Sequence, residues 1–300
     1  MGSFSRILGG VGAVTLAGIT LGAAASPVQA MSRSANSVIV PCDAATLVTE
    51  IQAANTAGVA TLLLAPNCIY NYATGTTPSD ALPIITGDVT LVGGLNTTIR
   101  RDPAAPGFRI LEVASGATLR VRNVSILGGS TSGLGGGIQN AGTVVLEHTI
   151  LAGNRAMNGG AFANLAGATA MISHSVLKEN TAASVGGGAA INFAGTLTLS
   201  DVILTRNSAP INGGALNTQP GGVSNLVKSI VRNNTSGSPG GGISNLGTLN
   251  LDGTVVGQNR GSGGGGIATA NANVTLRNSI VNDNSPDNCS PPNTIPGCVN

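Results

Sequence analysis

Hydrophobic and polar positions alternate strictly along several short stretches of this chain. Three clear examples are Gly195–Leu199 (GTLTL), Gly247–Leu251 (GTLNL) and Ala272–Leu276 (ANVTL). Alternation over so few residues predicts short β-strands that bury one face. A second apolar group follows each stretch, as in Val202–Leu204. Because no helical period lies between these groups, the strands do not belong to βαβ units.

A repeat of about 26 residues organises the strands. Six segments end in a [Leu/Val]-x-x-Asn motif, and the successive asparagines are 26, 27, 27, 25 and 25 residues apart. These asparagines are Asn154, Asn180, Asn207, Asn234, Asn259 and Asn284. A Gly-Gly pair followed by an apolar residue lies upstream of each motif, as at Gly159–Phe162. A repeat of this length, with several short strands and no helix, predicts one coil of a parallel β-helix, an all-β fold.

Stacked coils would place equivalent residues in columns about 4.8 Å apart. Asparagine tolerates a left-handed backbone, and its amide bonds to the next amide of a ladder. We therefore expect the six asparagines to form a structural ladder at a corner of the coil. A further group of asparagines follows the Gly-Gly signals closely: Asn140, Asn164, Asn192, Asn217 and Asn245.

The open ends of a solenoid need caps. Thr46–Ala54 (TLVTEIQAA) has the apolar stripe of an amphipathic helix, so we expect it to cover the N-terminal end. The Pro-rich tail is expected to cover the other end. The predicted organisation is a signal peptide at 1–30, a cap and entry strand at 31–75, β-helix coils at 76–284, and a disulfide-closed cap at 285–300.

These repeats resemble the right-handed parallel β-helix proteins of the pectate-lyase-like superfamily. Among them the chain is most similar to the polymorphic-outer-membrane-protein-like repeat proteins of secreted bacterial sequences, whose signature pairs GGA[ILV] with FxxN. Gly159–Phe162 and Gly213–Leu216 match the first element, and the six Asn endings match the second with an aliphatic residue in place of Phe. The resemblance implies a secreted adhesion or binding protein.

The N-terminus has the layout of a secretory signal. Arg6 precedes an apolar stretch, Ile7–Ala25, and Ser26–Ala30 ends in a small-residue cleavage pattern. The alternative is an uncleaved anchor helix. After removal of the signal, we expect no membrane span and an extracellular location.

Four cysteines lie in the exported part, at Cys42, Cys68, Cys289 and Cys298. They allow three pairings. The local pairing, Cys42 with Cys68 and Cys289 with Cys298, would clip both ends of the domain, and an oxidising compartment favours disulfides. Metal binding is the alternative, but no CxxC pair or neighbouring histidine supports it.

Composition narrows the classes of function. Charged residues make up 9% of the chain, and the formal net charge is +2, which gives no basis for binding nucleic acid. With 42% hydrophobic residues the chain is able to form a core, so disorder is excluded. We expect no cofactor and a monomer.

Aligned repeats place chemically interesting residues in one exposed column. His148, His174 and Asp201 would follow one another about 5 Å apart, close enough to share a proton or a metal ion. A row of solvated corner residues is the interpretation we favour, because Asn, Gly and Lys occupy the same column elsewhere. Glu147 and Asp201 are the one carboxylate pair near the spacing needed for glycoside hydrolysis.

Five arginines belong to the early coils: Arg100, Arg101, Arg109, Arg120 and Arg122. They are either a binding patch for an acidic polymer or a solvated basic edge. The sequence as a whole predicts a non-catalytic protein that binds a polysaccharide or a cell-surface polymer. A polysaccharide lyase or glycoside hydrolase is the first alternative, and a purely structural extracellular protein is the second.

Overall fold

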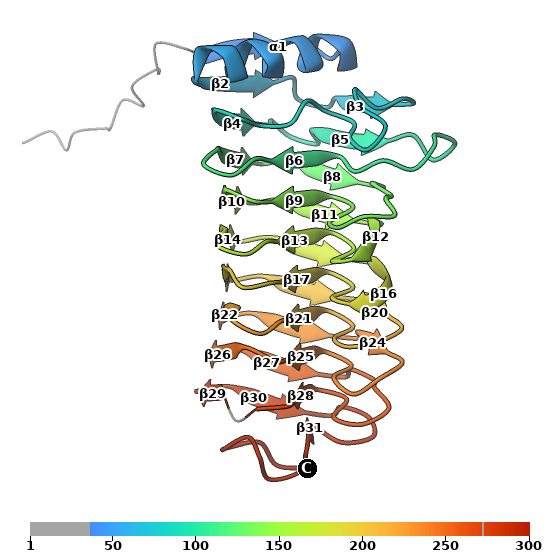
Figure 1. The fold of residues 1–300 in the computed structure, drawn as a ribbon, viewed down its shortest axis with the longest axis vertical. Helices are drawn as coiled ribbons and strands as arrows, with labels where there is room; N and C mark the ends of the chain where they lie inside the picture. Colours follow the sequence, from blue (N-terminus) through green and yellow to red (C-terminus); the bar gives the residue numbers. More distant parts are fainter. Residues whose placement is uncertain (1–36, 272) are drawn as a thin grey trace, which may run out of the picture. The chain divides into compact units, whose positions relative to one another are not determined.

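The computed structural model describes residues 37–271 and 273–300, which form a parallel β-solenoid of four sheets (Figure 1). The strands pair in parallel, with coil stacked on coil. This confirms the predicted β-helix. The predicted signal peptide and anchor alternative lie outside the described residues.

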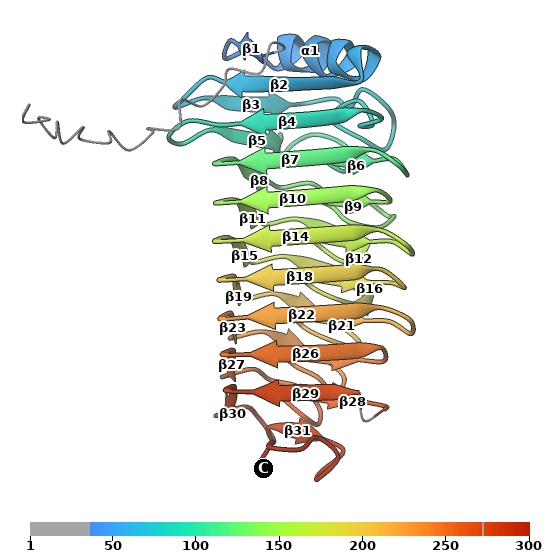
Figure 2. The same ribbon diagram turned by 90° about the vertical axis from the view of Figure 1, so that its left-hand side faces the viewer.

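The largest sheet has ten strands and faces the viewer in Figure 2. Its order is β1 (Ser37–Val40), β2 (Val59–Leu64), β4 (Asp88–Val92), β7 (Thr118–Arg122), β10 (Thr143–Glu147), β14 (Thr169–Ser173), β18 (Thr196–Ser200), β22 (Val223–Val227), β26 (Thr248–Asp252) and β29 (Val274–Arg277).

A nine-stranded sheet adjoins it around the coil. Its order is β3 (Ile69–Tyr72), β5 (Thr98–Arg101), β8 (Ser125–Leu127), β11 (Ile150–Ala152), β15 (Val176–Lys178), β19 (Ile203–Thr205), β23 (Ile230–Arg232), β27 (Val255–Gly257) and β30 (Ile280–Asn282).

Two further sheets close the coil. A four-stranded sheet holds β12 (Arg155–Asn158), β16 (Thr181–Gly186), β20 (Ser208–Ala209) and β24 (Thr235–Ser236). An eight-stranded sheet has the order β31 (Cys289–Ser290), β28 (Ile267–Thr269), β25 (Ile243–Asn245), β21 (Leu216–Thr218), β17 (Ala190–Asn192), β13 (Phe162–Asn164), β9 (Ile138–Asn140) and β6 (Leu111–Val113).

Period-two alternation fills the core, as the sequence predicts. In β18, Leu197 and Leu199 are buried while Thr196 and Thr198 point outward. Equivalent positions pair in register between coils, so the buried aliphatic residues form continuous inner columns. Phe162 fills the core from the eight-stranded sheet. The core therefore extends along the whole stack.

The Gly-Gly signals mark places where consecutive coils touch. A Cβ atom on Gly160 would overlap the carbonyl oxygen of Gly188, and one on Gly188 would overlap that of Gly214. Only glycine leaves room for backbones that approach so closely. Each signal is thus explained by the contact between its coil and the next.

Each coil turns sharply between the ten-stranded and the nine-stranded sheets, at one residue in the left-handed conformation. We call these residues the corner column: Asn123, His148, His174, Asp201, Lys228, Gly253 and Asn278. The next residue in each coil turns inward. Where this inward residue is Ser or Thr, its hydroxyl takes part in a hydrogen bond with the equivalent residue of a neighbouring coil. For example, the Thr149 N–H donates to Ser175 Oγ at 3.0 Å. The corner column therefore points to solvent above a buried hydroxyl row.

The six motif asparagines form a second corner, which we call the amide ladder. Asn154 Nδ2 donates to Asn180 Oδ1 at 3.1 Å, and Asn180 Nδ2 donates to Asn207 Oδ1 at 3.0 Å. The same bond continues through Asn234 and Asn259 to Asn284. All but the last of these side chains are buried.

Helix α1 (Ala44–Ala57) caps the N-terminal end, which confirms the predicted capping helix. Asp43 caps its N-terminus by accepting a hydrogen bond from the Thr46 N–H, and Gly58 ends it in the left-handed region. Leu47 and Ile51 are buried beneath the helix.

Both locally paired disulfides are present, Cys42–Cys68 and Cys289–Cys298. The first joins the entry segment to the first coils, and the second closes the C-terminal tail. Disulfides are compatible with an extracellular location. Within the described residues, no helix has both the length and the apolar character that crossing a bilayer requires.

Candidate functional site

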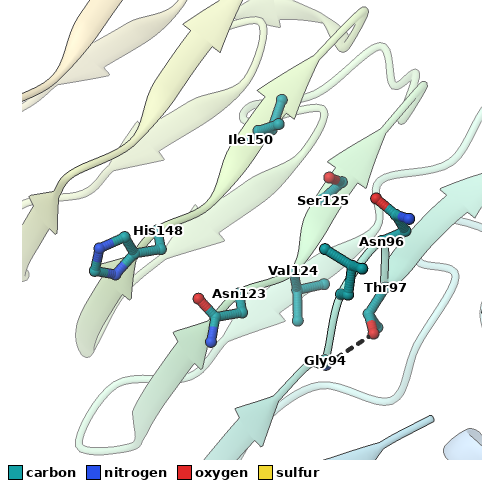
Figure 3. A pocket seen from close by; sticks show the side chains of 9 residues that line it. Gly94, Asn96, Thr97, Asn123, Val124, Ser125, His148 and Ile150 are labelled. Carbon is teal, nitrogen blue, oxygen red and sulfur yellow. Dashed lines mark hydrogen bonds between the residues drawn. The ribbon is translucent and has the colours of Figure 1, made fainter. Parts of the chain in front are cut away.

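A recess of about 460 Å³ opens beside the corner column near the N-terminal end of the stack (Figure 3). Asn123 and Ser125 line it from one coil, and His148 and Ile150 line it from the next coil toward the C-terminal end. The wall above is the connection between β4 and β5, which contains Leu95.

The recess exists because one connection is longer than those below it. Five residues (93–97) join β4 to β5, whereas two residues (123–124) join β7 to β8. The longer loop is held by a hydrogen bond from the Gly94 N–H to Thr97 Oγ1 at 3.0 Å. Leu95 at its tip is 73% exposed. The loop overhangs the next coil and so shelters the recess.

Below the recess, the outer face of the nine-stranded sheet carries only Ile and Val at one position of six successive coils. This aliphatic column consists of Ile150, Val176, Ile203, Ile230, Val255 and Ile280. The residue in the recess that continues it is Ser125. Three members of the column are more than a third exposed: Ile150, Val255 and Ile280.

Polar side chains flank the aliphatic column on both sides. The corner column lies on one side, and the last residues of the same strands lie on the other, including Lys178, Thr205 and Arg232. Charges of both signs occur: Asp201 and Lys228 are neighbours in the corner column. This face is therefore an apolar stripe between the corner column, which contains both signs of charge, and a strand-end border whose two charged residues, Lys178 and Arg232, are both basic.

The structure brings the two histidines together. The rings of His148 and His174 stack with centroids 5.0 Å apart and an interplanar angle of 10°. His174 Nε2 lies 4.0 Å from Asp201 Oδ2. Both imidazoles are about half exposed. The predicted succession of His148, His174 and Asp201 is therefore present as geometry, whereas a catalytic role for it stays a hypothesis.

Glu147 is engaged elsewhere. One of its carboxylate oxygens lies 2.6 Å from Arg122 Nη2, and the other lies 3.7 Å from His148 Nδ1. Asp201 lies two coils away and accepts a hydrogen bond from Ser200 Oγ at 3.2 Å. Neither carboxyl lies in the recess. The arrangement pairs one candidate acid with a guanidinium and leaves the other on an open corner.

The arginines of the early coils do not form one patch. Arg100 and Arg101 lie on β5 of the nine-stranded sheet, whereas Arg120 and Arg122 lie on β7 of the ten-stranded sheet. Arg109 is buried and pairs with Asp80.

The other four arginines are also partnered within the molecule. Arg120 pairs with Asp88 and Arg122 with Glu147. Arg100 Nε donates to Asn71 Oδ1 at 2.8 Å, and Arg101 Nε donates to the Gly128 carbonyl at 2.8 Å. These internal partners explain the arginines without a polyanionic ligand.

The aliphatic column is the feature that sequence reasoning missed. Its signal is present, because the residue before the Leu or Val of each Asn motif is always Ile or Val. In runs such as Val202–Leu204, however, three apolar residues stand together, and alternation alone does not tell which one points outward.

Comparison with known proteins adds no relative from which a function is transferable: no family model and no curated protein matches the chain. The resemblance to the pectate-lyase-like superfamily and to its polymorphic-outer-membrane-protein-like members therefore remains a prediction. The structure itself shows the parallel β-solenoid, its capping helix and its two disulfides.

Proposed function

We propose that this protein is a secreted, non-catalytic binding protein that holds an extended, uncharged polysaccharide along the aliphatic column. The single observation that carries the proposal is the repetition of an outward-facing, at least partly exposed Ile or Val in six successive coils. A surface that repeats with every coil is matched best by a ligand that is itself extended and repetitive.

The chemistry of the face favours a sugar polymer. Sugar rings have apolar C–H faces and polar edges, so such a chain would lay its apolar faces on Ile203 and Ile230 and direct hydroxyls toward the borders. Lys178 and Asp201 offer donors and acceptors there. Among the described residues no aromatic platform belongs to this face, since Tyr70, Tyr72, Phe108 and Phe162 are buried and the partly exposed Phe193 follows β17 of the eight-stranded sheet. Aliphatic contact takes their place in the proposal.

The charge pattern favours an uncharged polymer over an acidic one. The corner column contains both signs, the other border has only two cations (Lys178 and Arg232) in six coils, and the arginines of the early coils are partnered internally. Without a field of one sign, a polyanion gains little long-range attraction. The recess under Leu95 would receive the end or a branch of the polymer.

Retention on insoluble polysaccharides tests the proposal. Wild-type protein is incubated with cellulose, chitin and insoluble β-glucan, and with pectate as the charged comparison. Ile203→Glu and Ile230→Glu place a carboxylate in the apolar stripe, which would have to be desolvated on binding, so retention should fall about tenfold or more. Thr198→Glu adds the same charge to the ten-stranded face and should leave retention unchanged.

Two results would overturn the proposal. Equal retention of wild type and Ile203→Glu would remove the aliphatic column as the binding face, as would retention on pectate alone. New reducing or unsaturated ends would show catalysis and support the lyase or hydrolase alternative. A concentration-dependent dimer without retention would assign the face to contact between copies of the chain.

A further inference from the structure

The chain has two histidines in 300 residues, and the fold stacks them on each other. His148 and His174 occupy the same corner position of adjacent coils. Nothing in the fold requires imidazole there, because Asn123, Gly253 and Asn278 occupy the same left-handed position in other coils. The stacking of the two histidines is therefore not explained by the backbone conformation of the corner.

Both imidazoles are available to a ligand. Each is about half exposed, and the carboxylates of Glu147 and Asp201 lie 3.7 and 4.0 Å from their ring nitrogens. Neither ring makes a hydrogen bond within the described part of the chain. Glu147 already pairs with Arg122, which leaves Asp201 as the carboxylate free to serve a cation.

A shared metal ion would require the nitrogens of the two imidazoles to converge. Zinc–imidazole bonds are about 2.0–2.1 Å long, so two nitrogens bound to one ion lie about 2.9–3.4 Å apart for bond angles between square and tetrahedral. The rings stack at 5.0 Å. Among the described residues no three His, Cys, Asp or Glu side chains already converge as a metal site. Binding therefore requires the exposed imidazoles to rotate about their side-chain bonds until their nitrogens converge.

We propose that His148 and His174 chelate one divalent transition-metal ion of the Zn²⁺, Ni²⁺ or Cu²⁺ class, with Asp201 as a third ligand and water completing the coordination. Imidazole is a ligand that these ions share, and Cu²⁺ should bind most tightly of the three. The site is open to solvent, so its role is to bind the ion at the surface. This inference does not depend on the proposed polysaccharide binding.

Isothermal titration of the tag-free full chain with ZnCl₂, NiCl₂ and CuCl₂ tests the site. His148→Asn and His174→Asn are suitable variants, because asparagine already occupies this left-handed corner in other coils. Each should weaken binding about tenfold or more, and Asp201→Asn should weaken it by a smaller factor. Glu179→Gln removes an exposed carboxylate from the other corner of the coil of His174 and should leave binding unchanged.

Histidine NMR separates a specific site from loose association. Zn²⁺ should shift the ring signals of both histidines together at one equivalent, and removal of the ion with EDTA should restore the metal-free spectrum. Unchanged affinity in both His→Asn variants would overturn the proposal. Zinc-induced shifts of only one ring would also overturn it, since chelation requires both.

Discussion

The solenoid contains two columns of asparagine that differ in completeness. In the amide ladder each buried side chain is fully engaged: Asn180 Oδ1 accepts from both the N–H and the Nδ2 of Asn154, and Asn180 Nδ2 donates to Asn207 Oδ1 and to the Leu151 carbonyl. A second amide column runs along the end of the eight-stranded sheet, from Asn140 through Asn164 to Asn192. There the ladder stops.

Thr218 occupies the next place in this second column. Its hydroxyl donates to Ser224 Oγ at 2.8 Å, and Asn192 Nδ2 donates to the same oxygen at 3.1 Å. Ser224 lies between Leu197 and Leu249 in an otherwise aliphatic inner column. A pair of hydroxyls thus replaces one amide rung.

The replacement leaves buried groups without partners in the described structure. Asn245 Oδ1 follows Thr218 in the column and has no hydrogen bond, because threonine offers no amide donor. Asn217 lies on the opposite face of the same strand, and both polar atoms of its buried amide lack a partner. The two columns show that the buried amides of a ladder are fully hydrogen-bonded only where every coil supplies an asparagine side chain.

The largest effect is expected from breaking the complete ladder. Asn207→Ala removes the acceptor of the Asn180 N–H, the donor to the Leu177 carbonyl and the donor to Asn234 Oδ1. Stranding these buried groups should lower the free energy of unfolding by about 4 kcal/mol. Urea denaturation measures it. A loss below about 1 kcal/mol would mean that water satisfies the ladder as well as asparagine does.

The interrupted column should be repairable only by two changes together. Thr218→Asn alone leaves Ser224 without its hydroxyl partner, and Ser224→Leu alone leaves the buried Thr218 hydroxyl without its acceptor. The double variant restores the amide rung and the aliphatic column. A double-mutant cycle should give a favourable coupling of about 1–2 kcal/mol. Additive single effects would contradict the hydroxyl-pair account.

Asn217→Val should move stability in the opposite direction from Asn207→Ala. Valine removes a buried amide that makes no hydrogen bond and matches the Ile191 that precedes it in the column. We expect a gain of about 1 kcal/mol in the free energy of unfolding. Thermal unfolding of Asn217→Val and Asn207→Ala side by side compares the two changes. Destabilisation by Asn217→Val would mean that a buried water is hydrogen-bonded to the Asn217 amide.

The smallest effect on stability is expected for an exposed hydrogen bond, the cap that Asp43 forms with Thr46. The hydrogen bonds from the side chain and backbone of Thr46 lower the pKa of Asp43 at the start of α1. A carboxyl with a lowered folded-state pKa stabilises the fold above its unfolded-state pKa, and this contribution is lost as the pH falls through the folded value. The stability difference between wild type and Asp43→Asn should therefore change across that acidic range. A constant difference would exclude Asp43 as its source.

Much of the fold can be predicted from the sequence because every coil repeats the same pattern of buried aliphatic, turn-forming Gly and ladder-forming Asn residues. The corner position of His148 and His174 and the ladder of the Asn motifs follow from column alignment, and the two disulfides match the local pairing expected from the position of the cysteines near the two ends. The ladder place of Thr218 does not follow, because Asn217 and Thr218 are adjacent and the repeat length varies. The sequence also groups arginines that the fold separates, since Arg100 and Arg120 lie in strands of different sheets.

The sequence also does not predict which side chains of the three-residue strands point into the core and which point to solvent. The left-handed corner residue resets the alternation, so Val202 turns inward, Ile203 outward and Leu204 inward. The inner ladders hold successive coils in register, and this register aligns Ile203 with its neighbours in one continuous outer column.

Methyl NMR of isoleucine-labelled protein, titrated with soluble oligosaccharides of the retained polymer, tests most directly whether that column is the binding face. The outward-facing set is Ile150, Ile203, Ile230 and Ile280, and the buried control set is Ile126, Ile172, Ile243 and Ile267. We predict saturable shifts in the exposed set and little change in the buried set. Saturable binding that leaves the four outer methyl groups unshifted would contradict the account.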